Sequence, residues 1–189
     1  MRVLFLENQD SFSWNVIDAL PVKREDVAIF SGHPSSTATQ QPRLTDYDCL
    51  IIGPGPTDPV RTGLIEIVHE ATRLELPTLG ICLGHQAIGL AFGAQLVRTD
   101  PCHGKRSIVT FQGSRSFPAI GGSRTVMRYH SLSLAGVKSP LKSVASTSDG
   151  IPMAIEHESL PIAGFQFHPD SYATEDGREM FASFFASML

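Results

Sequence analysis

The sequence predicts an α/β fold in which a mostly parallel sheet is flanked by helices and carries a small antiparallel extension. Two patterns in the 189 residues favour this class. Through the first half, short apolar runs alternate with longer amphipathic segments, as in βαβ units. After Gly93, strand-like segments follow one another with turns between them, which is typical of antiparallel pairing. A chain of this length is expected to form one domain, residues 1–189.

The first half contains four short apolar runs that are expected to be strands: Val3–Leu6, Val27–Phe30, Cys49–Ile52 and Thr78–Ile81. Apolar residues recur at helical spacing in three further segments, which are expected to be helices: Ser11–Leu20, Thr62–Leu74 and Ala87–Phe92. Pro21 stops the first helix. The segment Ser31–Thr45, rich in Ser, Thr, Gln and Pro, is expected to be an exposed loop.

The second half contains five strand candidates, of which at least one is expected to return to the main sheet: Leu96–Arg98, Ser107–Phe111, Thr125–Tyr129, Met153–His157 and Ile162–Phe167. The last helix, from about Asp176 to Leu189, carries one apolar stripe, which predicts packing onto the sheet.

The composition excludes several classes of protein. With 42% hydrophobic and 18% charged residues, the chain is globular rather than disordered. A net charge of −4 indicates no basic face for nucleic acid. The sequence contains no run of eighteen apolar residues, so no transmembrane helix is expected. The N-terminus does not have the pattern of a signal peptide, so a cytoplasmic location is expected. The three cysteines are expected to be reduced, and their spacing predicts no metal site and no cofactor.

The strongest local signal is the segment Gly80–Gly84, which reads Gly-Ile-Cys-Leu-Gly between a predicted strand and a predicted helix. This spacing is the cysteine form of a nucleophile elbow, a strained turn that needs small residues on either side. Such a turn exposes the sulfur of Cys82 at the carboxyl edge of the sheet, and the helix N-terminus that follows favours the thiolate. It also leaves the backbone N–H of Leu83 free to stabilise an oxyanion. The alternative is a buried structural cysteine at a tight turn.

A nucleophilic thiol needs a base, and His168 is the favoured candidate among seven histidines. It closes the last predicted strand, and Asp170, two residues on, could orient its ring. The other six are expected elsewhere: His103 and His130 beside a cleft, His85 directed away from the sulfur, and His33, His69 and His157 on the surface.

The turn Gly53–Pro56 follows the third strand and reads Gly-Pro-Gly-Pro. It is rigid, yet its glycine N–H groups can be approached by a ligand, so it could complete an oxyanion hole. It lacks the Lys-Ser/Thr ending of a phosphate-binding P-loop.

Taken together, Gly80–Gln86, the Pro-Gly-Pro turn and Phe167-His168-Pro169 resemble the class I, triad-type glutamine amidotransferases over nearly the whole chain. Within that family, Asn8–Phe12 with Asn15, His103–Lys105 and Arg128–Leu132 are similar to the glutaminase component of anthranilate synthase and aminodeoxychorismate synthase. The resemblance implies a flavodoxin-like domain that hydrolyses L-glutamine through a cysteine thioester and passes ammonia to a chorismate-binding synthase subunit.

The resemblance also implies a role for individual residues. Cys82 would be the nucleophile, His168 the acid–base and Asp170 the third member of the triad. Gly55 and Leu83 would supply the oxyanion N–H groups. The substrate would be held by Gly55, Pro56, Thr57, Gln86, Ser131 and Leu132. The partner interface would include Asp10, Ser11, Phe12, His103, Gly104 and Lys105.

Two positions depart from the family pattern. Thr57 stands where the family turn usually has a second glycine, and Asp170 stands where the family usually has Glu. These two departures favour one alternative function, a weakly active regulatory module. A second alternative is a stand-alone cysteine hydrolase of γ-glutamyl amides, which would need no partner.

Overall fold

The computed structural model describes residues 1–32 and 42–188. It contains one nine-stranded sheet, whose strands are β1 (Val3–Glu7), β2 (Val27–Ser31), β3 (Cys49–Ile52), β4 (Thr78–Ile81), β5 (Gln95–Phe111), β6 (Gly122–Ala135), β7 (Leu141–Ser146), β8 (Pro152–His157) and β9 (Ile162–Phe165). The α-helices in this part of the chain are α1 (Ser13–Ala19), α2 (Leu64–Arg73), α3 (Leu83–Ala91) and α4 (Gly177–Ala186).

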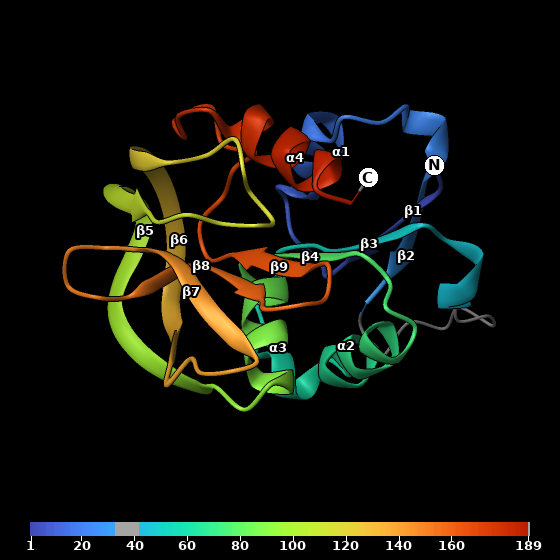
Figure 1. Cartoon of the computed structure of the whole chain (residues 1–189), viewed down its shortest axis with the longest axis horizontal. Helices are drawn as coiled ribbons and strands as arrows, with labels where there is room; N and C mark the ends of the chain where they lie inside the picture. Colours follow the sequence, from blue (N-terminus) through green and yellow to red (C-terminus); the bar gives the residue numbers. More distant parts are fainter. Residues whose placement is uncertain (33–41, 189) are drawn as a thin grey trace.

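The sheet has the order β2-β1-β3-β4-β9-β8-β7-β5-β6. The pairs from β2 to β9 are parallel, and the pairs from β9 to β6 are antiparallel. The predicted class, an α/β sheet with an antiparallel extension, is confirmed. The last strand in the chain, β9, lies in the middle of the sheet beside β4, so it returns to the parallel part as expected (Figure 1).

Helices cover both faces of the parallel strands. Figure 1 shows α1 and α4 on one side of the sheet and α2 and α3 on the other. Alternate residues of each strand separate into two apolar clusters, because successive side chains point to opposite faces. Val3 and Phe5 of β1 belong to the cluster under α1 and α4, whereas Leu4 and Leu6 belong to the cluster under α2 and α3.

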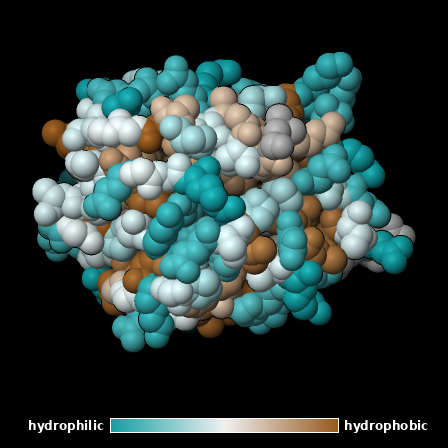
Figure 2. Space-filling view, in the orientation of Figure 1, coloured by the Kyte–Doolittle hydropathy of each residue, from teal (hydrophilic) through white to brown (hydrophobic). Residues whose placement is uncertain are grey.

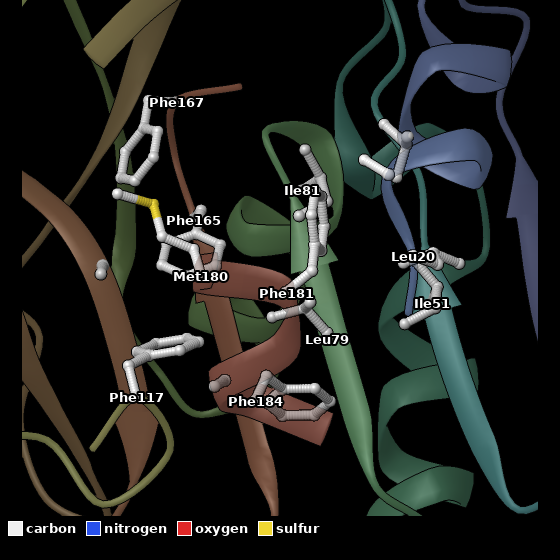
Figure 3. Packing of buried hydrophobic residues seen from close by; sticks show 14 of the residues in the cluster. Leu20, Ile51, Leu79, Ile81, Phe117, Phe165, Phe167, Met180, Phe181 and Phe184 are labelled. Carbon is white, nitrogen blue, oxygen red and sulfur yellow. The ribbon is translucent and has the colours of Figure 1, made fainter. Parts of the chain in front are cut away.

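The apolar stripe predicted for the last helix packs onto the sheet, as expected. Met180, Phe181 and Phe184 of α4 are fully buried beside the phenylalanines of β9 and the segment that follows it (Figure 3). Phe117, from the loop after β5, stacks on Phe165 with ring centroids 4.2 Å apart. Because aromatic side chains contribute the largest apolar area per residue, this cluster anchors the strand that ends near the predicted catalytic histidine.

Several element predictions need correction. Leu96–Arg98 and Ser107–Phe111 are parts of one strand, β5, in which register shifts absorb the residues between them. Strand β7 was not predicted at all, because Lys142 and Ser143 interrupt its apolar pattern. Helix α3 begins at Leu83, not at Ala87, because the turn at Cys82 leads straight into it.

The structure describes only the two ends of the predicted loop Ser31–Thr45. Residues 33–41, including His33, lie outside the described residues. Ser31 is exposed as predicted but ends β2, so it is not in a loop. Leu44 is buried in a short 3₁₀ turn, Leu44–Asp46, so it is not exposed as predicted.

Apolar and polar side chains are interspersed over the face shown in Figure 2, as on most globular proteins. Within residues 1–32 and 42–188, no helix is both long and apolar enough to cross a bilayer.

Candidate active site

The Gly-x-Cys-x-Gly segment forms the strained turn that its spacing predicts. Cys82 has φ +51° and ψ −95° and occupies the N-cap position of α3. A side chain at Gly80 would bring its Cβ to 2.3 Å from the backbone of Gly84, and one at Gly84 would meet the carbonyl oxygen of Ile52 at 2.3 Å. Only glycine therefore allows β4 to turn this sharply into a helix that rests against β3. A positive φ at a non-glycine residue costs about 1–3 kcal/mol and is common at active sites.

His168 lies three residues beyond the end of β9, next to β4, and faces Cys82. Its ring is almost fully buried, and its Nδ1 lies 3.3 Å from Oδ1 of Asp170. The rings of Tyr129 and Phe12 pack edge-on against it, with centroids at 5.1 and 5.7 Å. Its backbone N–H donates to Met127 O at 3.1 Å, so β6 fixes the position of the segment. The imidazole is thus held on both sides.

The neighbours of His168 favour the protonated form of its ring. Burial opposes protonation of the His168 ring, but the neighbouring Asp170 carboxylate and the Cys82 sulfur outweigh it and raise the pKa of the imidazole well above its ordinary value. Neither oxygen of Asp170 accepts a well-oriented hydrogen bond from any residue in the described part of the chain. The carboxylate therefore acts on the imidazole and on little else.

A cleft of about 370 Å³ opens over Cys82. It is lined by residues that were predicted to be catalytic, to supply an oxyanion N–H, to hold the substrate or to contact a partner, together with Tyr129 and His130. The lining residues are Asp10, Phe12, Gly55, Pro56, Thr57, Cys82, Gln86, His103, Tyr129, His130, Ser131, Leu132 and His168. A second hollow, of about 500 Å³, lies beside it between α1 and the turn after His168, and Cys82 does not line that one. The cleft is the size of an ordinary small-molecule site.

The turn at Gly55 meets the start of α3. A Cβ at Gly55 would fall 2.6 Å from Cδ2 of Leu83 and 2.8 Å from the side chain of Asn8, so this backbone packs too closely for any other residue. The side chain of Asn8 holds the turn, because its Nδ2 donates to Gly53 O at 2.9 Å. Leu83 is the first residue of α3, so its backbone N–H has no partner within the helix. The two predicted oxyanion donors are therefore neighbours.

Thr57 fits the turn despite replacing the family's usual glycine. The non-glycine residues with positive φ in residues 1–32 and 42–188 are Gln9, Glu75, Cys82 and Asp176, and Thr57 is not among them. Its hydroxyl donates to Asp58 O at 3.1 Å, and its side chain is half-buried at the edge of the cleft. A Cβ at this position therefore causes no backbone strain.

The residues expected to contact a partner lie around the mouth of the cleft. Asp10, Phe12 and His103 line it, whereas Ser11, Gly104 and Lys105 are exposed and do not. Asp10 accepts a hydrogen bond from the backbone N–H of Phe12 at 2.8 Å, which fixes the Asp10–Phe12 turn.

The remaining histidines are placed by burial. His69 is exposed, as predicted. His157 was expected on the surface but is buried, because the ring of Phe92 after α3 packs edge-on against its ring with centroids 5.1 Å apart. Its Nδ1 accepts hydrogen bonds from the backbone N–H groups of Ser159 and Leu160. His85 is fully buried against β9 and outside the cleft, and burial lowers its pKa to about 3.

Two residues to which the sequence assigned no role lie behind the cleft: Gln166, and Arg128, which was named only as the start of the motif Arg128–Leu132. Gln166 is fully buried, and its Nε2 lies 3.7 Å from the sulfur of Cys82. Arg128 is buried behind His130, to whose Nε2 its own Nε donates at 3.1 Å. The available signal for Gln166 was a polar residue within the otherwise apolar run Ile162–Phe167. Within the described residues, no group of three His, Cys, Asp or Glu side chains could hold a metal ion.

The chain is similar to known proteins along almost its whole length. The glutamine amidotransferase class-I family matches residues 4–188. The chain is 36% identical to anthranilate synthase component 2 of Mycobacterium tuberculosis, over 97% of this chain and 81% of that protein. It is 36% identical to the protein of the same name from Helicobacter pylori, over 95% of this chain and 94% of that protein.

Two further likenesses concern a longer protein and a solved structure. The chain is 38% identical to aminodeoxychorismate synthase of Streptomyces griseus, over 97% of this chain, but it spans about a quarter of that protein's length, 26%. A crystal structure of a glutamine amidotransferase from Thermotoga maritima shares the fold, with a TM-score of 0.73 at 18% identity, over 90% of this chain and 76% of that one. The sequence match along almost the whole chain shows that this protein belongs to the class-I glutamine amidotransferase family.

Proposed function

We propose that the chain hydrolyses L-glutamine to glutamate and ammonia and delivers the ammonia to a chorismate-binding synthase subunit. The observation that carries the proposal is the cleft that Cys82, on a strained turn, shares with His168 and Gly55, while Leu83 begins the helix that follows the turn. The relatives named anthranilate synthase component 2 and aminodeoxychorismate synthase support the reaction and the partner.

The chemistry begins with the Cys82 thiolate, which attacks the carbon of the glutamine side-chain amide. Negative charge develops on the amide oxygen, where the N–H groups of Gly55 and Leu83 stabilise it. The protonated ring of His168 donates its proton to the departing nitrogen, which leaves as ammonia, and a γ-glutamyl thioester remains on Cys82. Asp170 stabilises the imidazolium and fixes the tautomer in which Nδ1 carries a proton.

The second half of the reaction uses the same residues. Neutral His168 removes a proton from water, and the hydroxide attacks the thioester carbon. The tetrahedral intermediate collapses to glutamate, and the sulfur leaves as thiolate beside the reprotonated imidazole. In this proposal the remaining cleft residues hold the amino-acid end of the substrate: Pro56, Thr57, Gln86, Ser131 and Leu132.

Ammonia must reach the partner without being protonated in bulk water, because ammonium is not a nucleophile. We place the partner against the cleft mouth, where Asp10–Phe12 and His103–Lys105 lie. The proposal treats residues 1–189 as one domain that acts in the cytoplasm.

Activity of the purified chain with and without a chorismate-binding subunit tests the proposal. We expect weak glutaminase activity alone, strong activity in the complex, and a chorismate-derived amine as product. Full activity without a partner would instead support a stand-alone hydrolase of γ-glutamyl amides. No activity in either case would support a regulatory module, the reading motivated by Thr57 and Asp170.

A further inference from the structure

A continuous chain of hydrogen bonds runs behind the cleft from Arg128 to the sulfur of Cys82. Arg128 Nε donates to His130 Nε2 at 3.1 Å, and His130 Nδ1 lies 2.9 Å from Leu132 O. Gln86 Nε2 lies 3.1 Å from the same carbonyl oxygen and 3.1 Å from Oε1 of Gln166. Nε2 of Gln166 then lies 3.7 Å from Sγ of Cys82.

The donor and the acceptor of every hydrogen bond in this series follow from two groups whose roles are fixed, the guanidinium of Arg128 and the backbone carbonyl of Leu132. An arginine can only donate, so His130 Nε2 must accept, and its proton must sit on Nδ1. A backbone carbonyl can only accept, so the atom of Gln86 that faces Leu132 O must be the amide nitrogen. That nitrogen also faces Gln166, whose oxygen must therefore point to Gln86. The amide nitrogen of Gln166 is left facing the sulfur.

These hydrogen bonds require the ring of His130 to be neutral, and the surroundings of the ring favour that form. Burial and the nearby guanidinium of Arg128 lower the pKa of His130 to about 4. A protonated ring would have no lone pair to accept from Arg128. The side-chain orientation of Gln166 is thus determined by residues in β6 and α3, not by Gln166 alone.

We propose that Gln166 is a positioning residue for the nucleophile: its side-chain N–H donates to the Cys82 thiolate and holds the sulfur toward the substrate, while Gln86 fixes the direction of that N–H. The inference deepens the proposed function and rests on it. Gln166 does not line the cleft, so it acts through Cys82 and not on substrate. Gln86 then links the carbonyl of Leu132, at the substrate end of the cleft, to the reacting sulfur.

The test measures how fast iodoacetamide alkylates Cys82 as a function of pH, with the labelled peptide identified by mass spectrometry. Gln166→Met removes both polar atoms at nearly constant volume. Because a hydrogen bond to a charged group stabilises the charge, we expect the pH of half-maximal alkylation to rise by about one unit. We expect kcat for glutamine in the complex to fall about tenfold, with KM changed less than about threefold.

Gln166→Glu is the second variant, and it keeps the oxygen that Gln86 binds while removing the N–H. It should raise the same midpoint at least as much, because it also places negative charge beside the sulfur. Ser183→Ala is the matched control, since Ser183 is a buried residue of α4 that accepts a hydrogen bond from Ala119 N far from the chain. Its midpoint should equal that of the unaltered protein.

The coupling to Gln86 gives the sharpest readout. Gln86→Met alone should raise the midpoint by part of a unit, because the Gln166 amide can then rotate. In a Gln166→Met background, Gln86→Met should have no further effect on the midpoint, which a merely structural role would not produce. None of these variants substitutes a titratable or charged group around Cys82: Asp10, Tyr129, His168, Asp170, His130, His103, His85 and Arg128.

Unchanged midpoints in both Gln166 variants would overturn the inference, and so would additive effects of the two substitutions. The alkylation assay needs no glutamine, so it is independent of the proposed function. Shifted midpoints in a chain without glutaminase activity would support the inference and refute the function. Unshifted midpoints in an active glutaminase would do the reverse.

Discussion

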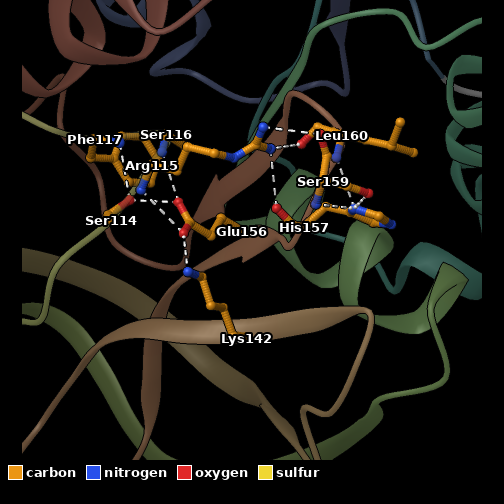
Figure 4. Close-up of polar contacts among 9 residues, drawn as sticks. All are labelled: Ser114, Arg115, Ser116, Phe117, Lys142, Glu156, His157, Ser159 and Leu160. Carbon is orange, nitrogen blue, oxygen red and sulfur yellow. Dashed lines mark hydrogen bonds and ion pairs between the residues drawn. The ribbon is translucent and has the colours of Figure 1, made fainter.

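Glu156 and Asp170 are buried carboxylates with opposite surroundings. The side chains of Glu156, on β8, and Asp170, after β9, have no exposed surface. Glu156 receives hydrogen bonds from Ser114 Oγ at 2.6 Å, from Ser116 N at 2.8 Å and from Arg115 N at 3.2 Å, and Lys142 Nζ lies at 2.8 Å (Figure 4). Asp170 faces a single polar partner within the described residues, the ring of His168.

The difference in partners gives the two carboxylates different effects. Burial opposes ionisation of Glu156, but Lys142, Ser114 and the two backbone N–H groups outweigh it and lower its pKa to about 2. Its charge is fully compensated and joins β7, β8 and the loop after β5. The charge of Asp170 is compensated by one imidazole, whose pKa rises in response. A carboxylate with many donors stabilises the fold, whereas one with a single partner tunes that partner.

The largest effect on activity is expected from the substitution of Cys82. Cys82→Ser should lower glutamine-dependent activity by at least about 10⁴-fold, because the serine hydroxyl is a far weaker nucleophile here. Ammonia-dependent synthesis by the complex should survive, since the sulfur only releases ammonia. Both rates can be measured in one preparation. Loss of both activities together would contradict this division of labour.

Asp170→Asn should lower kcat in the complex by about 10- to 1,000-fold, because a neutral amide does not stabilise the imidazolium and does not select the tautomer. The unfolding free energy should change little, since Asp170 has few other partners. Steady-state kinetics and urea unfolding of the same sample check both statements. Turnover equal to that of the unaltered protein would show that another group orients His168.

Glu156→Gln should have the opposite outcome. We expect the unfolding free energy at pH 7 to fall by about 2–4 kcal/mol, because an amide cannot satisfy Lys142 and three donors. At a temperature where the variant is folded, kcat should stay within about twofold of the unaltered value. A large loss of kcat without loss of stability would show that Glu156 contributes to the reaction, as Asp170 is proposed to do, and not to the fold.

The pH dependence of stability sharpens the same contrast. The pKa of Glu156 is lower in the folded protein than in the unfolded chain, so its stabilisation is complete above its ordinary value of 4.5 and is lost as the pH falls toward about 2. The difference in unfolding free energy between the protein and Glu156→Gln should therefore shrink below pH 4.5. Urea unfolding at pH 7, 4 and 3 measures it. A constant difference over that range would mean that the charge of Glu156 contributes nothing.

The smallest effect is expected for Asp170→Glu. The added methylene restores the acid that the family usually has and can shorten the present 3.3 Å separation from His168 Nδ1. We expect kcat to stay within about threefold of the unaltered value. A loss as large as that of Asp170→Asn would show that the backbone after His168 is fitted to the shorter side chain.

The parts of the site that depend on local sequence were predictable. Gly80 and Gly84 predict the turn at Cys82 because backbone contacts there exclude a Cβ, and His168 was found because strand ends meet at one edge. No role could be assigned to Gln166 from the sequence, since the orientation of its side-chain amide depends on Gln86 and Leu132, which lie far away in the chain.

The errors in the fold have the same origin. His157 and Leu44 are buried by non-local neighbours that their own segments do not reveal. The continuity of β5 past His103 and Gly104 is visible only once its pairing with β6 is known.

The position of β9 affects when this protein can become active during its synthesis. Cys82 is made early, but the strand that carries His168 to it is inserted between β4 and β8, both of which precede it in the chain. His168 follows Cys82 by 86 residues, which a ribosome adds in about 4 to 17 s at ordinary elongation rates. Until then the cleft over Cys82 lacks His168, the last of its lining residues to be made. A nascent chain therefore carries Cys82 for seconds before the cleft around its sulfur can be completed.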